Sequence, residues 1–315
     1  MNPAYSVILF TTFSGAGYGL LIFMALFAFA DGIPIDRWFG AVSFLFAFGM
    51  ILFGLFASTF HLGHPERIWL AFSQWRTSWL SREAVLSVGT LIPAALFAFS
   101  WVAFGEVDGA WRMMAGITMM LSVMTVYCTA MIYASLRTIR EWFNPHTIRV
   151  FLAFSIWTGS VWFNFLAHLF GLHSPWVGVP VAIAGLLVLF FKRKYWMFID
   201  RHPAWVTPES GTGLGELGNV RQLDAPNTQE NYVQKEMGYQ IARKHVYKIR
   251  RNAFMAYFLF PFLITLITME SERWMATTAA LISVMVMMAG TMAERWLFFA
   301  EAKHPVSVYS GSSGS

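Results

Sequence analysis

Charged side chains and cysteine are both scarce in this chain, and each scarcity excludes something. Only 12% of the 315 residues are charged, against roughly 25% in a typical soluble domain, so an ordinary soluble domain is excluded. The single cysteine, Cys128, cannot form an internal disulfide, and one thiolate does not hold an iron–sulfur cluster. Membrane haem needs axial ligands, usually histidine pairs, and only His168 falls inside an apolar run. We therefore expect no metal centre and no haem in this chain.

Long apolar runs dominate instead. Hydrophobic residues make up 57% of the chain, and the mean hydropathy is +0.54. A spanning helix needs about 20 largely apolar residues, and continuous runs favour helices over barrel strands. We place spans near 5–30, 38–60, 83–104, 113–136, 148–171, 175–191, 252–269 and 274–300. The sequence predicts an all-α integral membrane protein: one eight-helix domain over 1–309, a long loop over 192–251, and an artificial linker at 310–315.

Lysine and arginine are sorted between the gaps that separate these spans. Nineteen of the 22 fall in every second gap or near the C-terminus, and eleven of those lie in the long loop. The remaining gaps hold only Arg37, Arg112 and Arg273. Cytoplasmic loops carry the Lys/Arg excess in membrane proteins, and the excess persists when the long loop is left out. We therefore expect both termini and the long loop to be cytoplasmic.

The gap between the second and third spans gathers ionisable side chains at one membrane edge. They are His61, His64, Glu66, Arg67, Arg76, Arg82 and Glu83. Quinone turnover moves two protons with two electrons, so an acid–base group must reach the ring oxygens, and histidine can serve near neutral pH. Glu83 is either a second proton carrier or a charge favoured by the helix dipole, with Ser81 as a candidate cap. From spacing alone, ordinary interfacial polarity is the simpler interpretation.

The strings HLGHPER at 61–67 and SWLSREA at 78–84 resemble the signature of the DMSO reductase anchor-subunit family. The resemblance covers essentially the whole chain and fits the eight spans. It implies that His61 and Glu83 bind a quinone, either ubiquinone or menaquinone. Arg67 and Arg82 join this expected site on proximity, to orient Glu83 or to contact a partner. In this pattern His64 and Glu66 fall at variable positions, so no role is assigned to them.

The long loop resembles that of membrane anchors in cytoplasmic sulfite-oxidising molybdoenzymes. The matching stretches are PESGTGLG at 208–215, NYVQKEMG at 231–238 and ARKH at 242–245. The resemblance implies a subunit of the bacterial inner membrane, bound on its cytoplasmic face to an iron–sulfur electron-transfer subunit and a molybdopterin catalytic subunit. Those partners hold the iron–sulfur clusters and the molybdenum cofactor, and they act on the sulfur substrate. Electrons are expected to pass from sulfite to the quinone.

Residues 229–251 within the loop have the pattern of a basic amphipathic helix. Its apolar stripe includes Val233, Met237, Ile241 and Ile249. The basic residues expected to dock the partner subunits are Lys235, Arg243, Lys244 and Lys248. A helix lying on anionic lipid has the same pattern, and the two interpretations are compatible.

Two other functions stay open. An anchor of the same family would oxidise quinol for a reductase of DMSO or tetrathionate, because the redox potentials of the partners set the direction of electron flow. A secondary transporter belongs to another class, and the spans lack the clear midplane charge pair that coupled transporters usually carry. The small residues at 15–19 allow close helix approach or leave room for a quinone ring.

Overall fold

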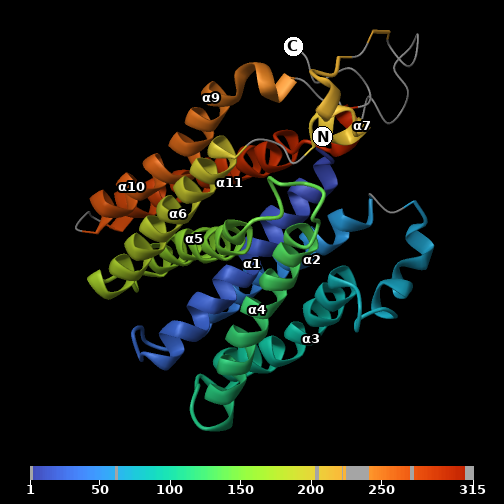
Figure 1. The fold of residues 1–315 in the computed structure, drawn as a ribbon. Coiled ribbons are helices and arrows are strands. Elements are labelled where there is room, and N and C mark those ends of the chain that lie inside the picture. The colour runs from blue at the N-terminus through green and yellow to red at the C-terminus, as the bar shows by residue number, and fades with distance from the viewer. Residues whose placement is uncertain are drawn as a thin grey trace.

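The computed structural model describes residues 3–60, 63–202, 206–221, 223–224, 241–269 and 273–308. These ranges form a bundle of helices and contain no strand (Figure 1). Eight helices within them are long and apolar enough to cross a membrane. The predicted all-α membrane fold with eight spans is therefore confirmed, with the long loop between the sixth and seventh spans.

Five of the first six spans are single helices, the third ends in a π-helical turn, and the seventh is composite. The first six spans are α1 (Tyr5–Phe29), α2 (Arg37–Thr59), α3 (Trp79–Phe99, extended by the π-helical turn η2, Ser100–Phe104), α4 (Ala110–Ala134), α5 (Pro145–Phe170) and α6 (Pro175–Arg201). The seventh combines α9 (Ile241–Phe254), the π-helical turn η4 (Met255–Leu259) and α10 (Phe260–Thr268), and the eighth is α11 (Arg273–Ala300). Short helical segments are η1 (Pro65–Phe72), α7 (Pro208–Thr212), η3 (Gly215–Leu217) and η5 (Pro305–Val308).

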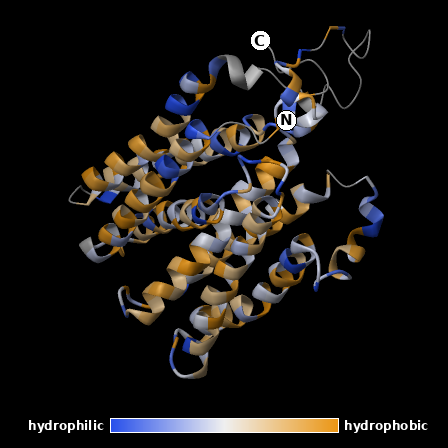
Figure 2. Ribbon diagram, viewed as in Figure 1, coloured by the Kyte–Doolittle hydropathy of each residue, from blue (hydrophilic) through white to orange (hydrophobic). Residues whose placement is uncertain are grey.

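Helices α1 and α5 form the centre of the bundle. In their most apolar stretches 78% and 83% of residues are buried, whereas the other six spans bury between 33% and 44%. The outer helices direct large apolar side chains away from the protein, among them Leu45, Phe56 and Ile92. Figure 2 shows hydrophobic residues along the helices and hydrophilic residues gathered toward their ends. This distribution matches a bundle whose solvent is lipid.

The central helices meet backbone to backbone at two glycines. A Cβ atom on Gly19 would lie 1.9 Å from the carbonyl oxygen of Ser155, and one on Gly159 would lie 2.0 Å from the carbonyl carbon of Gly19. Gly17 faces α2, where a Cβ atom would lie 2.6 Å from Ile51 Cγ1. Small residues permit such approach between helices in lipid. Neighbouring helices therefore occupy the space beside Gly17 and Gly19 that a quinone ring would need.

Two spans extend further than their apolar runs. Helix α6 continues to Arg201 instead of ending near 191, and the seventh span begins at His245 instead of near 252. Three charged residues in these extensions have partners: Lys192 pairs with Glu294, and Arg250 pairs with Asp200 and with Glu301. Pairing lowers the cost of carrying charge into a span. Hydropathy alone therefore ends the sixth span too early and begins the seventh span too late.

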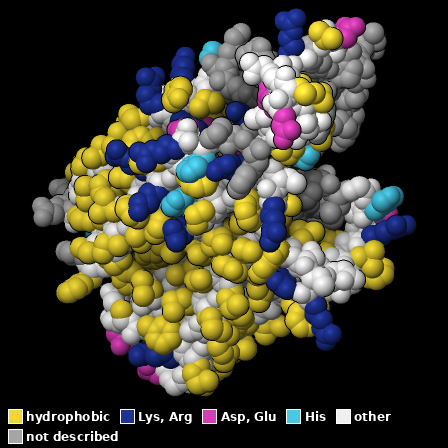
Figure 3. Space-filling model, viewed as in Figure 1, with side chains coloured by type: hydrophobic (Ala, Val, Ile, Leu, Met, Phe, Trp, Pro, Cys, Tyr) yellow, Lys and Arg dark blue, Asp and Glu magenta, His cyan; other side chains and the backbone are white. Residues whose placement is uncertain are grey.

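One side of the bundle carries η1, the 135–144 connection, α7, the start of α1 and the end of α11, and we call it the basic side (Figure 1). Trp142 Nε1 donates to the carbonyl oxygen of Phe298 at 2.9 Å, and Lys303 N donates to Glu141 Oε2 at 3.3 Å. Burial raises the pKa of Glu141 above its usual range. Figure 3 shows Lys and Arg side chains gathered around this side above a broad hydrophobic surface.

Candidate functional site

A pocket lies on the basic side between α1, α2, α3 and α4, and we call it the α1–α4 pocket. Its volume is about 320 Å³, at the small end of the range of small-molecule sites. Most of its wall is apolar. The lining residues are Val7, Phe10, Leu55, Ser58, Ile68, Ala71, Phe72, Leu80, Glu83, Ala84, Ser87, Val88, Ile132 and Tyr133. The pocket therefore suits an apolar ligand that meets a few polar groups.

Glu83 is the only carboxylate among the described residues that line this pocket. Its side chain is 4% exposed and accepts a short hydrogen bond from the hydroxyl of Thr129 on α4. Helix α3 begins at Trp79, and its first turn holds no acidic residue, so the alternative of a charge placed there for the helix dipole is wrong. The capping position belongs to Ser78 and not to Ser81. Glu83 instead faces inward from the second turn.

The segment η1 covers the pocket from the basic side. It contributes Ile68, Ala71 and Phe72 to the lining, while the neighbouring Trp69 is exposed. Trp69, Trp75 and Trp79 are not among the described lining residues. The segment can begin at Pro65, because proline at a first helical position is pre-set in φ and needs no donor.

Arg67 and Arg82, the two arginines assigned to the site, make their described contacts with groups other than Glu83. Arg82 Nε donates to the carbonyl oxygen of Trp75 at 3.0 Å, and Nη2 donates to that of Arg76 at 2.6 Å. Its guanidinium lies 4.2 Å from the centre of the Trp79 ring. Arg82 therefore holds the connection between η1 and α3. Arg67 is exposed at a kink within η1.

Of the two histidines in the motif, His64 belongs to the described residues. His61 lies outside the described residues. His64 is exposed, and its Nδ1 lies 2.9 Å from Glu66 Oε1. An exposed pair of this kind adds little to stability, which fits the absence of an assigned role for either residue.

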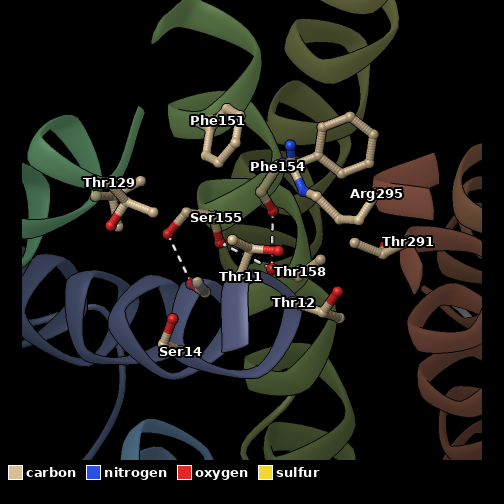
Figure 4. A pocket seen from close by; sticks show the side chains of 12 residues that line it. Thr11, Thr12, Ser14, Thr129, Phe151, Phe154, Ser155, Thr158, Thr291 and Arg295 are labelled. Atoms are coloured by element: carbon tan, nitrogen blue, oxygen red, sulfur yellow. Dashed lines mark hydrogen bonds between the residues drawn. The ribbon is translucent and has the colours of Figure 1, made fainter. Parts of the chain in front are cut away.

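A small cavity with polar walls lies next to the α1–α4 pocket, and we call it the polar cavity. The two are connected by Thr129, which lines the polar cavity and donates to Glu83. The polar cavity lies between α1, α4, α5 and α11, with Thr129 on one side and Arg295 on the other (Figure 4). Its volume is about 10 Å³, which is room for about one water molecule. The lining residues are Thr11, Thr12, Ser14, Gly15, Val126, Thr129, Phe151, Phe154, Ser155, Thr158, Thr291 and Arg295.

Arg295 also belongs to a group of interior charged residues, which we call the buried charge cluster: Lys192, Glu294 and Arg295. Their side chains are 1%, 0% and 2% exposed. Lys192 Nζ donates a short hydrogen bond to Glu294 Oε1, and Glu294 Oε2 lies 3.5 Å from Arg295 Nε. The guanidinium of Arg295 lies 4.0 Å from the centre of the Phe151 ring. From the sequence we expect no clear charge pair at the midplane; a pair exists, nearer the basic-side ends of α6 and α11.

Comparison with known proteins assigns the bundle to a family. Residues 1–300 match the family described as DMSO reductase anchor subunit (DmsC). The chain belongs to this family. It is also 32% identical to a sulfite dehydrogenase subunit of Allochromatium vinosum, over 98% of this chain and 98% of that protein. The protein is thus a multi-pass membrane anchor subunit of a DMSO reductase or sulfite dehydrogenase type of complex, as the motifs indicated, and an anchor implies catalytic partner subunits.

The expected docking residues of the anchor subunit fall on or beside α9. Lys235 lies outside the described residues, and Arg243 and Lys244 belong to the helix. Lys248 is exposed. Helix α9 is kinked at His245, where the seventh span begins, so its part from His245 onward belongs to that span and residues 241–244 precede the kink. Arg250 departs from the basic face, because its side chain is paired with Asp200 and Glu301.

Opposite the basic side, two histidines of the anchor subunit stack at the end of α5. The ring centres of His168 and His173 are 3.7 Å apart. Burial lowers the pKa of His173, which favours its neutral form. His168 is 3% exposed, so it is a packed side chain within the bundle.

Proposed function

We propose that the anchor subunit binds a quinone in the α1–α4 pocket and exchanges electrons between it and an iron–sulfur partner subunit on the cytoplasmic face. The observation that carries the proposal is a mostly apolar pocket at the basic side that contains one buried carboxylate, Glu83. Leu80 and Val88 line the pocket and are each 48% exposed, so the pocket is not closed at this wall. A lipid-soluble ligand therefore has a lateral approach from the bilayer.

The residues present fit a quinone. A bound quinone supplies an acceptor for two electrons and two protons. Apolar side chains such as Phe72 and Ile132 hold a ring and its tail, and Glu83 holds a proton for a ring oxygen. Thr129 donates to Glu83 Oε1, which leaves Oε2 as the oxygen available to a ligand. Ser58 lines the pocket, and His61 follows it by three residues, a chain reach of at most about 11 Å.

The direction of electron flow and the orientation in the membrane are proposed from the similarity to a relative and from the distribution of Lys and Arg. The similarity to a sulfite dehydrogenase subunit supports electron flow from sulfite, through a molybdopterin catalytic subunit and the iron–sulfur subunit, into the quinone pool. The Lys/Arg excess of the basic side supports its cytoplasmic placement in a bacterial inner membrane, with both termini inside. A quinol-oxidising anchor of a reductase would use the same pocket in reverse.

The decisive experiment replaces Glu83 with glutamine, which keeps the shape of the side chain and removes its exchangeable acid. Quinone-linked turnover of the complete complex is expected to fall by at least about a hundredfold, the scale of positioned acid–base catalysis. His61→Ala is expected to act in the same direction. Turnover with an artificial soluble electron acceptor should persist in both variants, because that acceptor bypasses the anchor.

The exposed carboxylate Glu66 provides the matched control, and Glu66→Gln should leave both activities unchanged. Full quinone-linked turnover in Glu83→Gln would contradict the proposed site. Loss of both activities together would report failed assembly of the complex.

We further propose that the basic residues on and before α9 dock the partner subunits. Reversing Lys244 and Lys248 together to glutamate is expected to release the iron–sulfur and catalytic subunits from membranes, because charge complementarity holds such an interface. Copurification at physiological salt measures the effect, and high salt should release the wild-type partners as well. Unchanged copurification of the double variant would contradict this docking surface.

A further inference from the structure

We propose that η1 and the turn after it form the surface on which an acidic face of the iron–sulfur partner subunit docks. The inference rests on the proposed function and deepens it, because that function needs a redox partner close to the α1–α4 pocket. The surface consists of exposed tryptophan, leucine and arginine side chains, and we call it the η1 patch: Arg67, Trp69, Leu70, Trp75 and Arg76.

The segment η1 touches the pocket on one face and leaves its other side chains uncovered. Ile68, Ala71 and Phe72 line the pocket, and their spacing of three and four residues places them on one face of a helical segment. Trp69 and Leu70 fall between them in the sequence and are exposed. None of the eight residues of η1 is buried by the described part of the chain. An apolar surface is therefore left open directly over the pocket.

The composition of the η1 patch is typical of a protein interface. Trp69 is 67% exposed, and Trp75 and Leu70 are exposed as well, with two arginines beside them. Tryptophan and arginine are enriched at the centres of protein interfaces and carry much of the binding free energy there. The outer spans instead direct purely apolar side chains such as Phe56 toward lipid. The mixture of Trp and Arg favours a protein partner over lipid tails.

The turn after η1 is held in one shape before any partner binds. Arg82 donates to the carbonyl oxygens of Trp75 and Arg76, at 3.0 and 2.6 Å. The guanidinium of Arg76 lies 5.5 Å from the centre of the Trp75 ring. The Ser73 hydroxyl donates to the carbonyl oxygen of Leu70 at 2.7 Å. A surface ordered in advance loses less conformational freedom on binding, so these contacts favour docking.

The charge of the η1 patch indicates the chemistry of its partner. Arg67 and Arg76 form no ion pair with the described residues. The neighbouring carboxylate of Glu66 is already engaged, because its Oε1 lies 2.9 Å from His64 Nδ1. The patch thus presents positive charge around an apolar centre. A partner face that carries carboxylates around apolar side chains complements it.

The place of the η1 patch explains why the iron–sulfur subunit is the partner. The segment η1 is the wall of the pocket on the basic side, and Ile68 and Phe72 belong to that wall. A helix with its side chains is about 10–12 Å across, so a protein seated on the patch lies about that far from a ligand in the pocket. Docking at this surface therefore brings a redox centre of the partner toward the quinone.

The first test places a photo-crosslinker on the patch in the complete complex. Trp69→p-benzoylphenylalanine keeps a large aromatic side chain at position 69, and irradiation is expected to join it to the iron–sulfur subunit, as identified by mass spectrometry. Trp274 gives the matched control, because it is also 67% exposed and lies at the start of α11, at the opposite end of the bundle. The same replacement at Trp274 should give no partner adduct. An adduct with lipid alone at position 69 would overturn the docking surface and assign the patch to the bilayer.

The second test measures partner binding to membranes that contain the anchor. Trp69→Ala is expected to weaken binding of the iron–sulfur subunit by about tenfold or more, the scale of an interface hot spot. Arg67→Glu should weaken it as well, whereas Arg67→Lys keeps the charge and should bind more tightly than Arg67→Glu. Trp274→Ala should bind like the wild type. Wild-type binding in both Trp69→Ala and Arg67→Glu would overturn the proposal.

The docking surface and the quinone site are judged separately. Quinone-linked turnover in Glu83→Gln decides the quinone site, while the crosslink from position 69 is expected to form in that variant as in the wild type. An active Glu83→Gln with an intact crosslink overturns the quinone site alone. A Trp69→Ala complex that binds its partners normally but loses quinone turnover would make Trp69 a quinone-binding residue and overturn the docking surface alone.

Discussion

Replacing Gly159 with valine is expected to prevent the bundle from forming. Gly159 lies where α5 crosses α1, and even the first carbon of a side chain would come within 2.0 Å of the Gly19 backbone. Backbone atoms cannot rotate aside as a side chain can, so the two central helices must separate. Overpacking usually costs about 1–3 kcal/mol, and a backbone collision at the centre of the bundle should exceed that. Membrane levels of the anchor and its thermal unfolding in detergent measure the effect.

Gly49 supplies the comparison for this prediction. It lies on α2, and a Cβ atom added there has no neighbour within 4 Å. Gly49→Ala should therefore accumulate and unfold like the wild type. A Gly159→Val protein that accumulates normally and unfolds at the wild-type temperature would show that α1 and α5 do not cross as described.

Removing only the negative member of the buried ion pair is expected to cause the second large loss. Glu294→Ala leaves Lys192, which is 1% exposed, without its carboxylate partner. Breaking a buried pair in this way costs about 3–5 kcal/mol, because one charge stays desolvated and unpaired. Replacing Lys192 and Glu294 together with methionine should recover part of the stability, since Arg295 is then the only member of the cluster that keeps a buried charge without its carboxylate. Thermal unfolding of the three proteins in detergent distinguishes these cases.

The order of the three stabilities is the decisive result. Glu294→Ala should be the least stable because it strands both Lys192 and Arg295, and the double variant, which strands only Arg295, should lie between it and the wild type. If the single and double variants unfold at the same temperature, the loss comes from missing volume and not from an unpaired charge, and the pair is not as isolated from water as the structure has it.

The fold was predictable because lipid imposes strict demands on a chain. A span must be apolar and long, and Lys/Arg sorting follows the side of the membrane, so a single sequence carries both signals. The α1–α4 pocket was predictable in part. Its motif drew attention to Glu83, and a charge so near the start of an apolar run is either a cap or an inward-facing group. Only the helix boundary at Trp79 separates these two possibilities.

The buried charge cluster was not predictable from runs of residues. Lys192 and Glu294 are 102 residues apart in sequence, and the packing of α6 near α11 is what brings them together. Lys192 follows an apolar run and therefore suggests the end of a span. An ionisable residue inside an otherwise apolar segment is nevertheless a signal, because it needs a partner in the interior. Glu294 is such a residue, and its position within the last apolar run was the available sign of a pair.

The central position of α1 has a consequence for biogenesis. It leaves the ribosome before the other described spans, yet α5, its backbone partner at Gly19, is synthesised only after three further spans. Until α5 is made, the polar residues of α1 lie in the bilayer without the helix that later covers them. Thr11 and Ser14 are adapted to this delay, since their hydroxyls bond the helix's own carbonyl oxygens of Val7 and Phe10. A nascent chain stalled before α5 should thus persist as an inserted but incomplete intermediate that is exposed to quality-control proteases.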